Sequence, residues 1–221
     1  MLRLYSYWRS TSSYRTRIAL NLKLLDYELR TVHLVRDGGE QNDETYRRLN
    51  PQGLVPLLVD GEFRLAQSLA IFQYLEALVP QPALVPEDAQ HAARMWSFCQ
   101  TIASDIQPLQ NLRVLHYLKD QLGVDDAART RWLQHWIGAG LDPLEAMLQQ
   151  YAESPYCFGD TPTYADCCLL PQLYAALRFG CALERWPRLA AVQSRCNEHP
   201  AFVAAHPSQQ PDAEPDKKPA S

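Results

Sequence analysis

The order of strand-like and helix-like patterns constrains the fold of this chain more than any other feature of the sequence. Apolar and polar residues alternate in residues 2–8, which is typical of a half-buried strand. Similar strand patterns recur only before residue 67, and the segments between them have helical spacing. Strands are expected at 2–8, 27–34, 55–59 and 62–65, and helices at about 13–25, 42–50 and 68–78. This order, βαβαββα, predicts a small mixed sheet with helices on its faces.

A proline-rich segment, "VPQPALVPED" at 79–88, separates this half from a second half with a different pattern. Beyond it, the long apolar patterns all have helical spacing, at 89–106, 111–122, 128–152 and 163–179. We therefore expect an α/β domain at 1–80, a linker at 81–88 and an all-helical domain at 89–206. The last stretch, 207–221, is polar and rich in proline, which predicts a flexible tail.

Composition excludes several broad functions. The chain has 221 residues and a net charge of −4, which argues against general binding of nucleic acid or anionic membranes. It lacks a run of roughly 20 apolar residues, as a membrane span requires, and its first residues lack the apolar run of a secretory signal. The six cysteines have no metal-ligand spacing, and Cys167 and Cys168 are neighbours in a helical pattern. We expect no metal site, free thiols and a cytoplasmic location.

Four consecutive hydroxyl residues stand where the first helix must begin. Residues 10–13 are Ser-Thr-Ser-Ser, between a strand expected to end at Trp8 and a helix expected to begin near Ser13. The backbone N–H groups of a helix start are unpaired and the helix dipole is positive there, while Arg9 and Arg15 add charge. Such a site stabilises an anion, and a thiolate is one candidate. Any one of the hydroxyls could instead simply cap the helix, although four exceed the needs of a cap.

Two further features of the first half favour a peptide-like anionic ligand. Pro56 interrupts the apolar run "LVPLL", which indicates an edge strand or a cis bond that would leave the Val55 backbone free to pair with a ligand. An ordinary strand start explains Pro56 equally well. Gln67 and Ser68 stand at another helix start, where they could bind a carboxylate. Ser68 could also serve there as a plain N-cap.

The second half contains one structural motif and two arginines of interest. Thr163 and Asp166 have the spacing of a capping box, for which we expect a structural role. Arg113 and Arg178 each lie in a largely apolar helical pattern. An arginine in such a place either extends along the surface with its stem buried or binds a carboxylate.

These motifs together resemble the zeta-class glutathione transferases. The resemblance runs from "YSYWRSTSSYRTRIALNLK" through "VRDGGEQ", "LNPQGLVPLL" and "QSLAIFQYLE" to "DIQPLQNLRVLHYL", "GDTPTYADCCLLPQ" and "HPSQQPDAEP", and so covers nearly the whole chain. The first, fourth and fifth of these motifs are highly specific in combination. The resemblance implies a glutathione transferase fold, with a thioredoxin-like βαβαββα domain followed by an all-helical domain.

The resemblance also implies roles for individual residues. Ser10 would donate a hydrogen bond to the glutathione thiolate, while Arg9 and Arg178 would act on the second substrate. The usual family cysteine is replaced by Ser12 and the usual tryptophan by Tyr14. The residues that fall where the family contacts glutathione are Ser10, Thr11, Ser12, Ser13, Tyr14, Arg15, Gln41, Val55, Gln67, Ser68, Gln107, Asn111, Leu112 and Arg113.

The implied activity is glutathione-dependent cis–trans isomerisation of maleylacetoacetate to fumarylacetoacetate, a step of tyrosine and phenylalanine catabolism. Glutathione would act as a cofactor, the second ligand would be a small dicarboxylate, and the protein would be a homodimer. Isomerisation of maleylpyruvate in gentisate-type degradation and glutathione conjugation are the alternatives within the family. A non-catalytic glutathione-binding protein is an alternative of another class, which the retained Ser10, Gln67 and Arg178 argue against.

Overall fold

The computed structural model describes residues 1–214. The chain forms two compact units. The first comprises Met1–Leu78 together with the chain from Pro200 onward, and the second is Val79–His199. Among the described residues, no helix is both long enough and apolar enough to cross a membrane.

The first unit contains a four-stranded mixed sheet with the strand order β2-β1-β3-β4. β1 pairs with β2 in parallel and with β3 antiparallel, and β4 pairs antiparallel with β3. The expected hairpin turns at Gly61, which has the positive φ of +58° that glycine adopts readily. The strands are β1 (Leu2–Ser6), β2 (Tyr27–Thr31), β3 (Leu57–Asp60) and β4 (Phe63–Ala66), so all four expected strands are confirmed.

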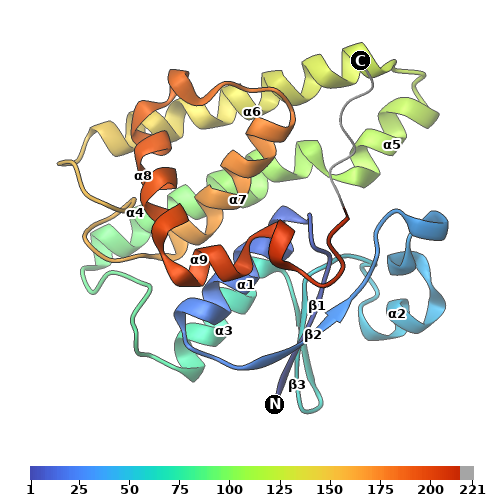
Figure 1. Ribbon diagram of the computed structural model, residues 1–221, viewed down its shortest axis with the longest axis horizontal. Helices are drawn as coiled ribbons and strands as arrows, with labels where there is room; N and C mark the ends of the chain where they lie inside the picture. Colours follow the sequence, from blue (N-terminus) through green and yellow to red (C-terminus); the bar gives the residue numbers. More distant parts are fainter. Residues whose placement is uncertain (215–221) are drawn as a thin grey trace. The chain divides into compact units, whose positions relative to one another are not determined.

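Helices pack on both faces of this sheet. α1 (Thr11–Leu22) and α3 (Ser68–Leu78) lie on one side, and α2 (Glu44–Leu49) lies on the other (Figure 1). On the α2 side, Tyr46 packs in a cluster with Leu57 and Val59 of β3. The alternation of buried side chains along the strands therefore supplies both layers of the core, as the thioredoxin-like prediction requires.

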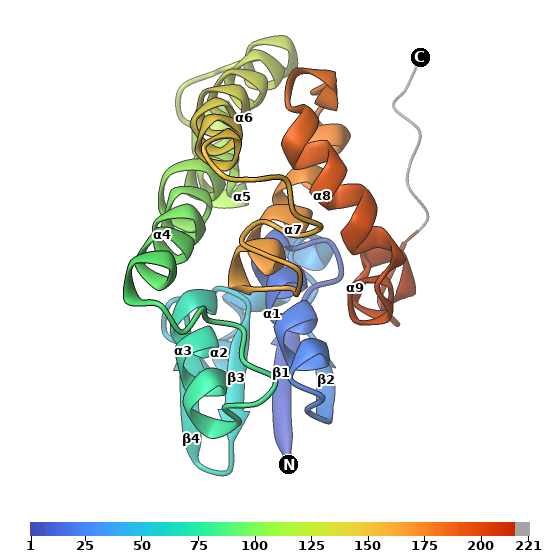
Figure 2. The same cartoon turned by 90° about the vertical axis from the view of Figure 1, so that its left-hand side faces the viewer.

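The carboxyl-terminal segment joins the first unit, which corrects two expectations. The helical domain was expected to extend through residue 206, but α9 (Pro200–Ala205) packs beside α1 (Figure 2). Arg17 Nε and Asn21 Nδ2 on α1 donate hydrogen bonds to the carbonyls of Ala205 and Ala201, at 3.1 and 2.9 Å. Within the expected flexible tail 207–221, residues 207–214 are held by hydrogen bonds, and 215–221 lie outside the described residues.

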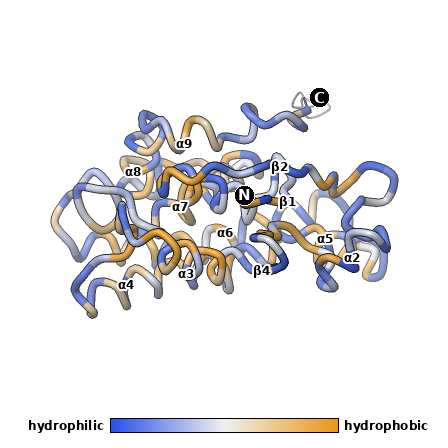
Figure 3. Tube along the Cα trace, turned by 90° about the horizontal axis from the view of Figure 1, so that it is seen from below, coloured by the Kyte–Doolittle hydropathy of each residue, from blue (hydrophilic) through white to orange (hydrophobic). Residues whose placement is uncertain are grey.

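The second unit is helical throughout its described elements, as expected. α4 and α8 pack against α7, which is predominantly hydrophobic along its trace (Figure 3). The expected capping box is present, since Asp166 accepts a hydrogen bond from the Thr163 N–H at 2.8 Å and Thr163 caps the helix in return. The α-helices are α4 (Ala89–Gln100), α5 (Leu112–Asp120), α6 (Asp126–Gln149), α7 (Tyr164–Arg178) and α8 (Pro187–Glu198).

The segment after α4 departs from the single helix expected at 89–106. It widens to a π-helix over Thr101–Ile106, tightens to a 3₁₀-helix over Gln107–Gln110, and ends at Asn111, the N-cap of α5. A π-turn in a helix is frequently found at a functional site. Ile106 packs closely on α6 at Gly140, where an added Cβ would lie 2.2 Å from Ile106 Cγ1. Packing on Gly140 therefore holds the irregular segment in place.

We expect Gly140→Ala to lower the free energy of unfolding by about 1–3 kcal/mol, because a branched side chain must shift in a packed core. Gly138 offers a matched control on the same helix, since a Cβ there would meet its nearest atom at 3.7 Å, an ordinary contact. Gly138→Ala should leave stability unchanged or raise it by up to about 1 kcal/mol through helix propensity. Urea unfolding of the two variants measures the difference. Equal stabilities would show that Ile106 relaxes without cost.

Candidate active site

The register of the sheet brings the candidate residues of the first unit to one edge. β1 and β2 are parallel and paired along their lengths, so the loops that follow them leave at the same edge. β3 runs antiparallel to β1, with Leu57 opposite Tyr5. The segment before β3, which includes Val55, therefore lies at the same edge. β4 ends at this edge because Ala66 lies opposite Leu57, and Gln67 follows it. The structure thus gathers candidates that are far apart in the sequence.

Ser10 immediately precedes α1, which begins at Thr11, two residues before the expected start near Ser13. It is the N-cap, and its Oγ accepts a hydrogen bond from the Ser13 N–H at 3.2 Å. The hydroxyl proton is not used in this bond and remains available to a ligand. Within residues 1–214 the N–H groups of Thr11 and Ser12 have no hydrogen-bond partner. The site therefore offers one hydroxyl and two backbone donors to an anion.

Three of the expected glutathione contacts point into the protein interior. Ser13, Tyr14 and Arg15 are at most 1% exposed. The Ser13 hydroxyl accepts a hydrogen bond from the Tyr7 N–H, and the Tyr14 ring packs on that of His206. Contact between these residues and glutathione stays a prediction that rests on the resemblance. Their burial follows from the packing of α1 against α3 and α9.

The expected cis bond at Val55-Pro56 is present. Val55 is 9% exposed, and neither of its backbone groups has a hydrogen-bond partner among the residues that the structure describes. Since buried backbone groups are nearly always paired, these groups favour a ligand with a peptide backbone.

Gln67, and not Ser68, occupies the N-cap position of α3. The helix begins at Ser68, and the Gln67 carbonyl accepts its first hydrogen bond, from the Ile71 N–H at 2.9 Å. Gln67 has a φ of +71°, which is unusual for a residue other than glycine. Such backbone conformations concentrate at ligand-binding sites. Plain capping by Ser68 is therefore wrong, while its place at a helix start is confirmed.

Gln41 lies in the loop that follows β2, at the same edge. Its Nε2 donates to the Leu34 carbonyl at 3.2 Å, while its Oε1 is buried and accepts no hydrogen bond within the described part of the chain. Gly39 makes room for this side chain, since a Cβ there would lie 2.4 Å from Gln41 Nε2. A buried acceptor without a donor fits a ligand that supplies an N–H group.

The remaining candidate glutathione contacts lie in the second unit. Gln107 follows the π-segment, and Asn111 accepts a hydrogen bond from the Arg113 N–H at 3.1 Å as the N-cap of α5. Leu112 is half-buried and Arg113 is exposed. The break between α4 and α5 thus places all four on a short irregular stretch and the first turn of α5.

The two arginines expected to act on the second substrate lie in different units. Arg9 is half-buried and lies over the Trp8 ring at 4.9 Å, in the loop that carries Ser10. Arg178 is the last residue of α7, and its guanidinium lies 4.5 Å from the centre of the Phe179 ring. Arg178 is exposed, and its role toward the second substrate stays a prediction. Its position at a helix end explains the exposure, because Leu177 beside it is also exposed.

Arg17 is a residue whose importance the sequence did not indicate. It is completely buried, and it donates hydrogen bonds to the Trp8 carbonyl at 2.9 Å, to Ser6 Oγ at 3.0 Å and to the Ala205 carbonyl at 3.1 Å. It therefore ties the loop before Ser10 to the end of α9. The only available signal was an arginine within an apolar helix start, which does not specify these partners.

No arrangement of three or more His, Cys, Asp or Glu side chains suited to a metal occurs in residues 1–214. All six cysteines are free, as expected. Burial raises the pKa values of the Cys99, Cys157 and Cys167 thiols well above the ordinary range, so these groups are protonated and unreactive. These three thiols are therefore not candidates for a nucleophile at neutral pH.

Comparison with known proteins identifies the family. The model of the glutathione S-transferase N-terminal domain matches residues 1–77, and that of the C-terminal domain matches residues 126–192. The maleylacetoacetate isomerase of Pseudomonas aeruginosa is 49% identical over 96% of this chain and 98% of its own length. The probable maleylacetoacetate isomerase of Vibrio cholerae is 47% identical over 95% of this chain and 97% of its own length. The maleylpyruvate isomerase of a Ralstonia species is 44% identical, over 96% and 100%.

Solved structures agree with these sequence relatives. The holo structure of a maleylpyruvate isomerase, described as a bacterial zeta-class glutathione S-transferase, has a TM-score of 0.93 and 44% identity and covers 96% of this chain and 100% of its own. Maleylacetoacetate isomerase from Anaeromyxobacter dehalogenans, with dicarboxyethyl glutathione and citrate in its active site, has a TM-score of 0.85 and 39% identity and covers 99% and 97%. The chain therefore belongs to the zeta class of the glutathione S-transferases, the group that includes the maleylacetoacetate and maleylpyruvate isomerases.

Proposed function

We propose that the protein is a glutathione-dependent cis–trans isomerase that converts maleylacetoacetate to fumarylacetoacetate. The observation that carries this proposal is Ser10 at the start of α1, where a hydroxyl proton and two backbone N–H groups are available to an anion. A maleylacetoacetate isomerase at 49% identity and a probable one at 47% are among its relatives, which favours this substrate.

The residues at the sheet edge fit glutathione, which is a small acidic peptide. The unpaired backbone of Val55 matches its peptide groups, the buried Gln41 Oε1 matches an N–H donor, and the start of α3 at Gln67 suits a carboxylate. Glutathione bound there would supply the thiolate needed for reversible addition to the conjugated double bond. Ser10 donates a hydrogen bond to that sulfur and so favours its charged form at neutral pH.

The second substrate is a dianion, so a protein of net charge −4 needs local positive charge to bind it. Arg9 is adjacent to Ser10 and can hold a carboxylate or the developing charge on the substrate carbonyl oxygen. Arg113 and Arg178 are exposed in the second unit and are the further candidates for the distal carboxylate.

The experiment that tests the choice of substrate compares kcat/KM for maleylacetoacetate and maleylpyruvate in the presence of glutathione. We expect the larger value for maleylacetoacetate. The reverse order would assign the protein to maleylpyruvate isomerisation, as in its Ralstonia relative. Loss of free thiol with the appearance of an adduct would instead assign a conjugating transferase.

We expect Arg178→Met to raise the KM for the diacid by about tenfold, the effect of losing one charge-assisted hydrogen bond. Affinity for glutathione should change little, because Arg178 is not among the residues expected to contact glutathione. Methionine retains most of the length of the side-chain stem, so the variant reports the charge. Arg131→Met, an exposed arginine on α6, is the matched control. Unaltered kinetics in Arg178→Met would show that Arg178 does not bind the diacid and would leave Arg9 and Arg113 as the candidates for its carboxylates.

We also propose that the protein is a cytoplasmic homodimer. Large apolar side chains stay exposed on the first unit, with Phe63 48% and Leu78 44% accessible. Association would cover them. Sedimentation at micromolar concentration should give a species of about twice the chain mass of 25.2 kDa. A single species at the chain mass would contradict this expectation.

A further inference from the structure

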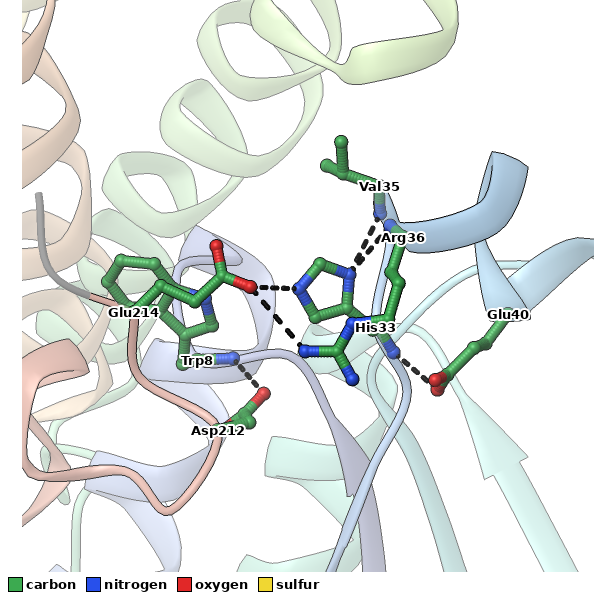
Figure 4. Close-up of polar contacts among 7 residues, drawn as sticks. All are labelled: Trp8, His33, Val35, Arg36, Glu40, Asp212 and Glu214. Atoms are coloured by element: carbon green, nitrogen blue, oxygen red, sulfur yellow. Dashed lines mark hydrogen bonds and ion pairs between the residues drawn. The ribbon is translucent and has the colours of Figure 1, made fainter. Parts of the chain in front are cut away.

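The last described residues, 206–214, lie against two loops at the candidate site. We call these residues the terminal segment. It follows α9, forms a short 3₁₀-turn over Pro207–Gln209 and runs to Glu214 (Figure 4). The two loops are residues 7–10, which lead from β1 to Ser10, and residues 33–41, which follow β2 and carry Gln41.

Asp212 holds the first of these loops. Its Oδ2 accepts a hydrogen bond from the Trp8 N–H at 3.0 Å (Figure 4). The Trp8 carbonyl accepts from Arg17 at 2.9 Å, so both backbone groups of this buried residue are fixed. Ser10 follows two residues later, and its N–H donates to the Tyr7 carbonyl at 3.1 Å. The position of Ser10 therefore depends on a carboxylate 204 residues from Trp8.

Glu214 holds the second loop. Its Oε1 lies 3.0 Å from His33 Nε2 and 3.5 Å from Arg36 Nη2 (Figure 4). His33 Nδ1 accepts a hydrogen bond from the Arg36 N–H at 2.8 Å. This pattern assigns the ring proton to Nε2, which donates a hydrogen bond to Glu214. The hydrogen bond from His33 lowers the pKa of the Glu214 carboxyl, so the pair is formed at neutral pH.

Apolar packing supports both contacts. Ala213, between the two acids, packs against the buried cluster that includes Tyr7, Trp8 and Val32. Tyr7 begins the first loop and Val32 immediately precedes the second, and the Val32 N–H donates a hydrogen bond to the Ser6 carbonyl at 2.8 Å. The terminal segment therefore bridges the two loops at the point where they leave the sheet.

We infer that Asp212 and Glu214 are positioning residues for glutathione, with Asp212 acting through the loop that carries Ser10 and Glu214 acting through the loop that carries Gln41. This inference rests on the proposed function. Each acid acts through hydrogen bonds to a loop, so each should affect a different property of bound glutathione. Asp212 should affect the pKa of the bound thiol, and Glu214 should affect the dissociation constant of glutathione.

The test uses the full-length protein and the variants Asp212→Ala and Glu214→Ala, with Asp212→Asn and Glu214→Gln as conservative partners. Glu28→Ala is the control, because the carboxylate of Glu28 on β2 pairs with Arg30 on the same strand. Titration with glutathione gives the dissociation constant, and the ultraviolet absorbance of the thiolate against pH gives the pKa of the bound thiol. Thermal unfolding shows whether each variant is folded.

We expect Asp212→Ala to raise the bound thiol pKa and lower kcat by about fivefold, with the dissociation constant nearly unchanged. Asp212→Asn, which keeps an acceptor for the Trp8 N–H, should restore most of this loss. Glu214→Ala should weaken glutathione binding by about fivefold without altering the thiol pKa. Lower melting temperatures with unchanged thiol pKa and affinity would overturn the inference and leave the proposed function intact. A wild-type protein that neither binds glutathione nor lowers its thiol pKa would overturn both.

Discussion

Ser10→Ala is expected to lower isomerase turnover by at least about tenfold, while the protein remains folded. A hydrogen bond to a charged group contributes roughly 1.5–3 kcal/mol, which corresponds to about 10- to 100-fold in rate. The alanine also removes the cap that accepts the Ser13 N–H, at a cost of about 1 kcal/mol in stability. The measurement is kcat at saturating glutathione, together with the free energy of unfolding.

Two further variants separate the hydroxyl from the cap. Ser10→Gly lacks the hydroxyl but costs only a few tenths of a kcal/mol as an N-cap, so it should be as inactive as Ser10→Ala and more stable. Ser12→Ala removes a nearby half-buried hydroxyl and should retain activity. If Ser12→Ala is inactive and Ser10→Ala is not, the thiolate donor lies two residues further on. If none of them loses activity, Tyr5 on β1 becomes the candidate donor.

Arg17→Met should lower the free energy of unfolding by about 3 kcal/mol or more. The side chain is completely buried and binds Ser6 Oγ and the carbonyls of Trp8 and Ala205, which methionine cannot satisfy. Because two of these partners hold the loop before Ser10, activity should fall even under conditions in which the variant is folded. Urea unfolding and glutathione titration measure the two effects.

Arg64→Met provides the matched control for this substitution. Arg64 is exposed on β4, and its hydrogen bond to the Arg48 carbonyl is long, at 3.4 Å, so its loss should change stability by no more than about 0.5 kcal/mol. Arg17→Lys keeps the charge and should recover part of the loss. A stability of Arg17→Met close to that of Arg64→Met would show that the hydrogen bonds of Arg17 do not hold α9 and the loop.

Local patterns predicted the elements of both units because the signals are themselves local. The alternation in β1 and the Asp60-Gly61 turn depend on residues within a few positions, and both are confirmed. The cis bond at Pro56 was one of the readings left open, and the structure selects it. The capping box of α7 is likewise a short-range motif that the structure contains.

Contacts between distant segments could not be predicted from the same patterns. Tyr14 and Arg15 point inward because α9 packs on α1, and no pattern within α1 specifies that contact. The π-segment after α4 depends on the close approach of Ile106 to Gly140, which lies on another helix. Asp212 was counted in a flexible tail because its surroundings are polar and rich in proline, although it binds the Trp8 N–H.

The most direct test of the central claim is an absorbance assay of maleylacetoacetate with and without glutathione, in which free thiol is measured before and after the reaction. The account predicts conversion to the trans isomer only when glutathione is present, with all of the thiol recovered at the end. Equal conversion without glutathione, or consumption of one thiol for each molecule of substrate, would contradict the account.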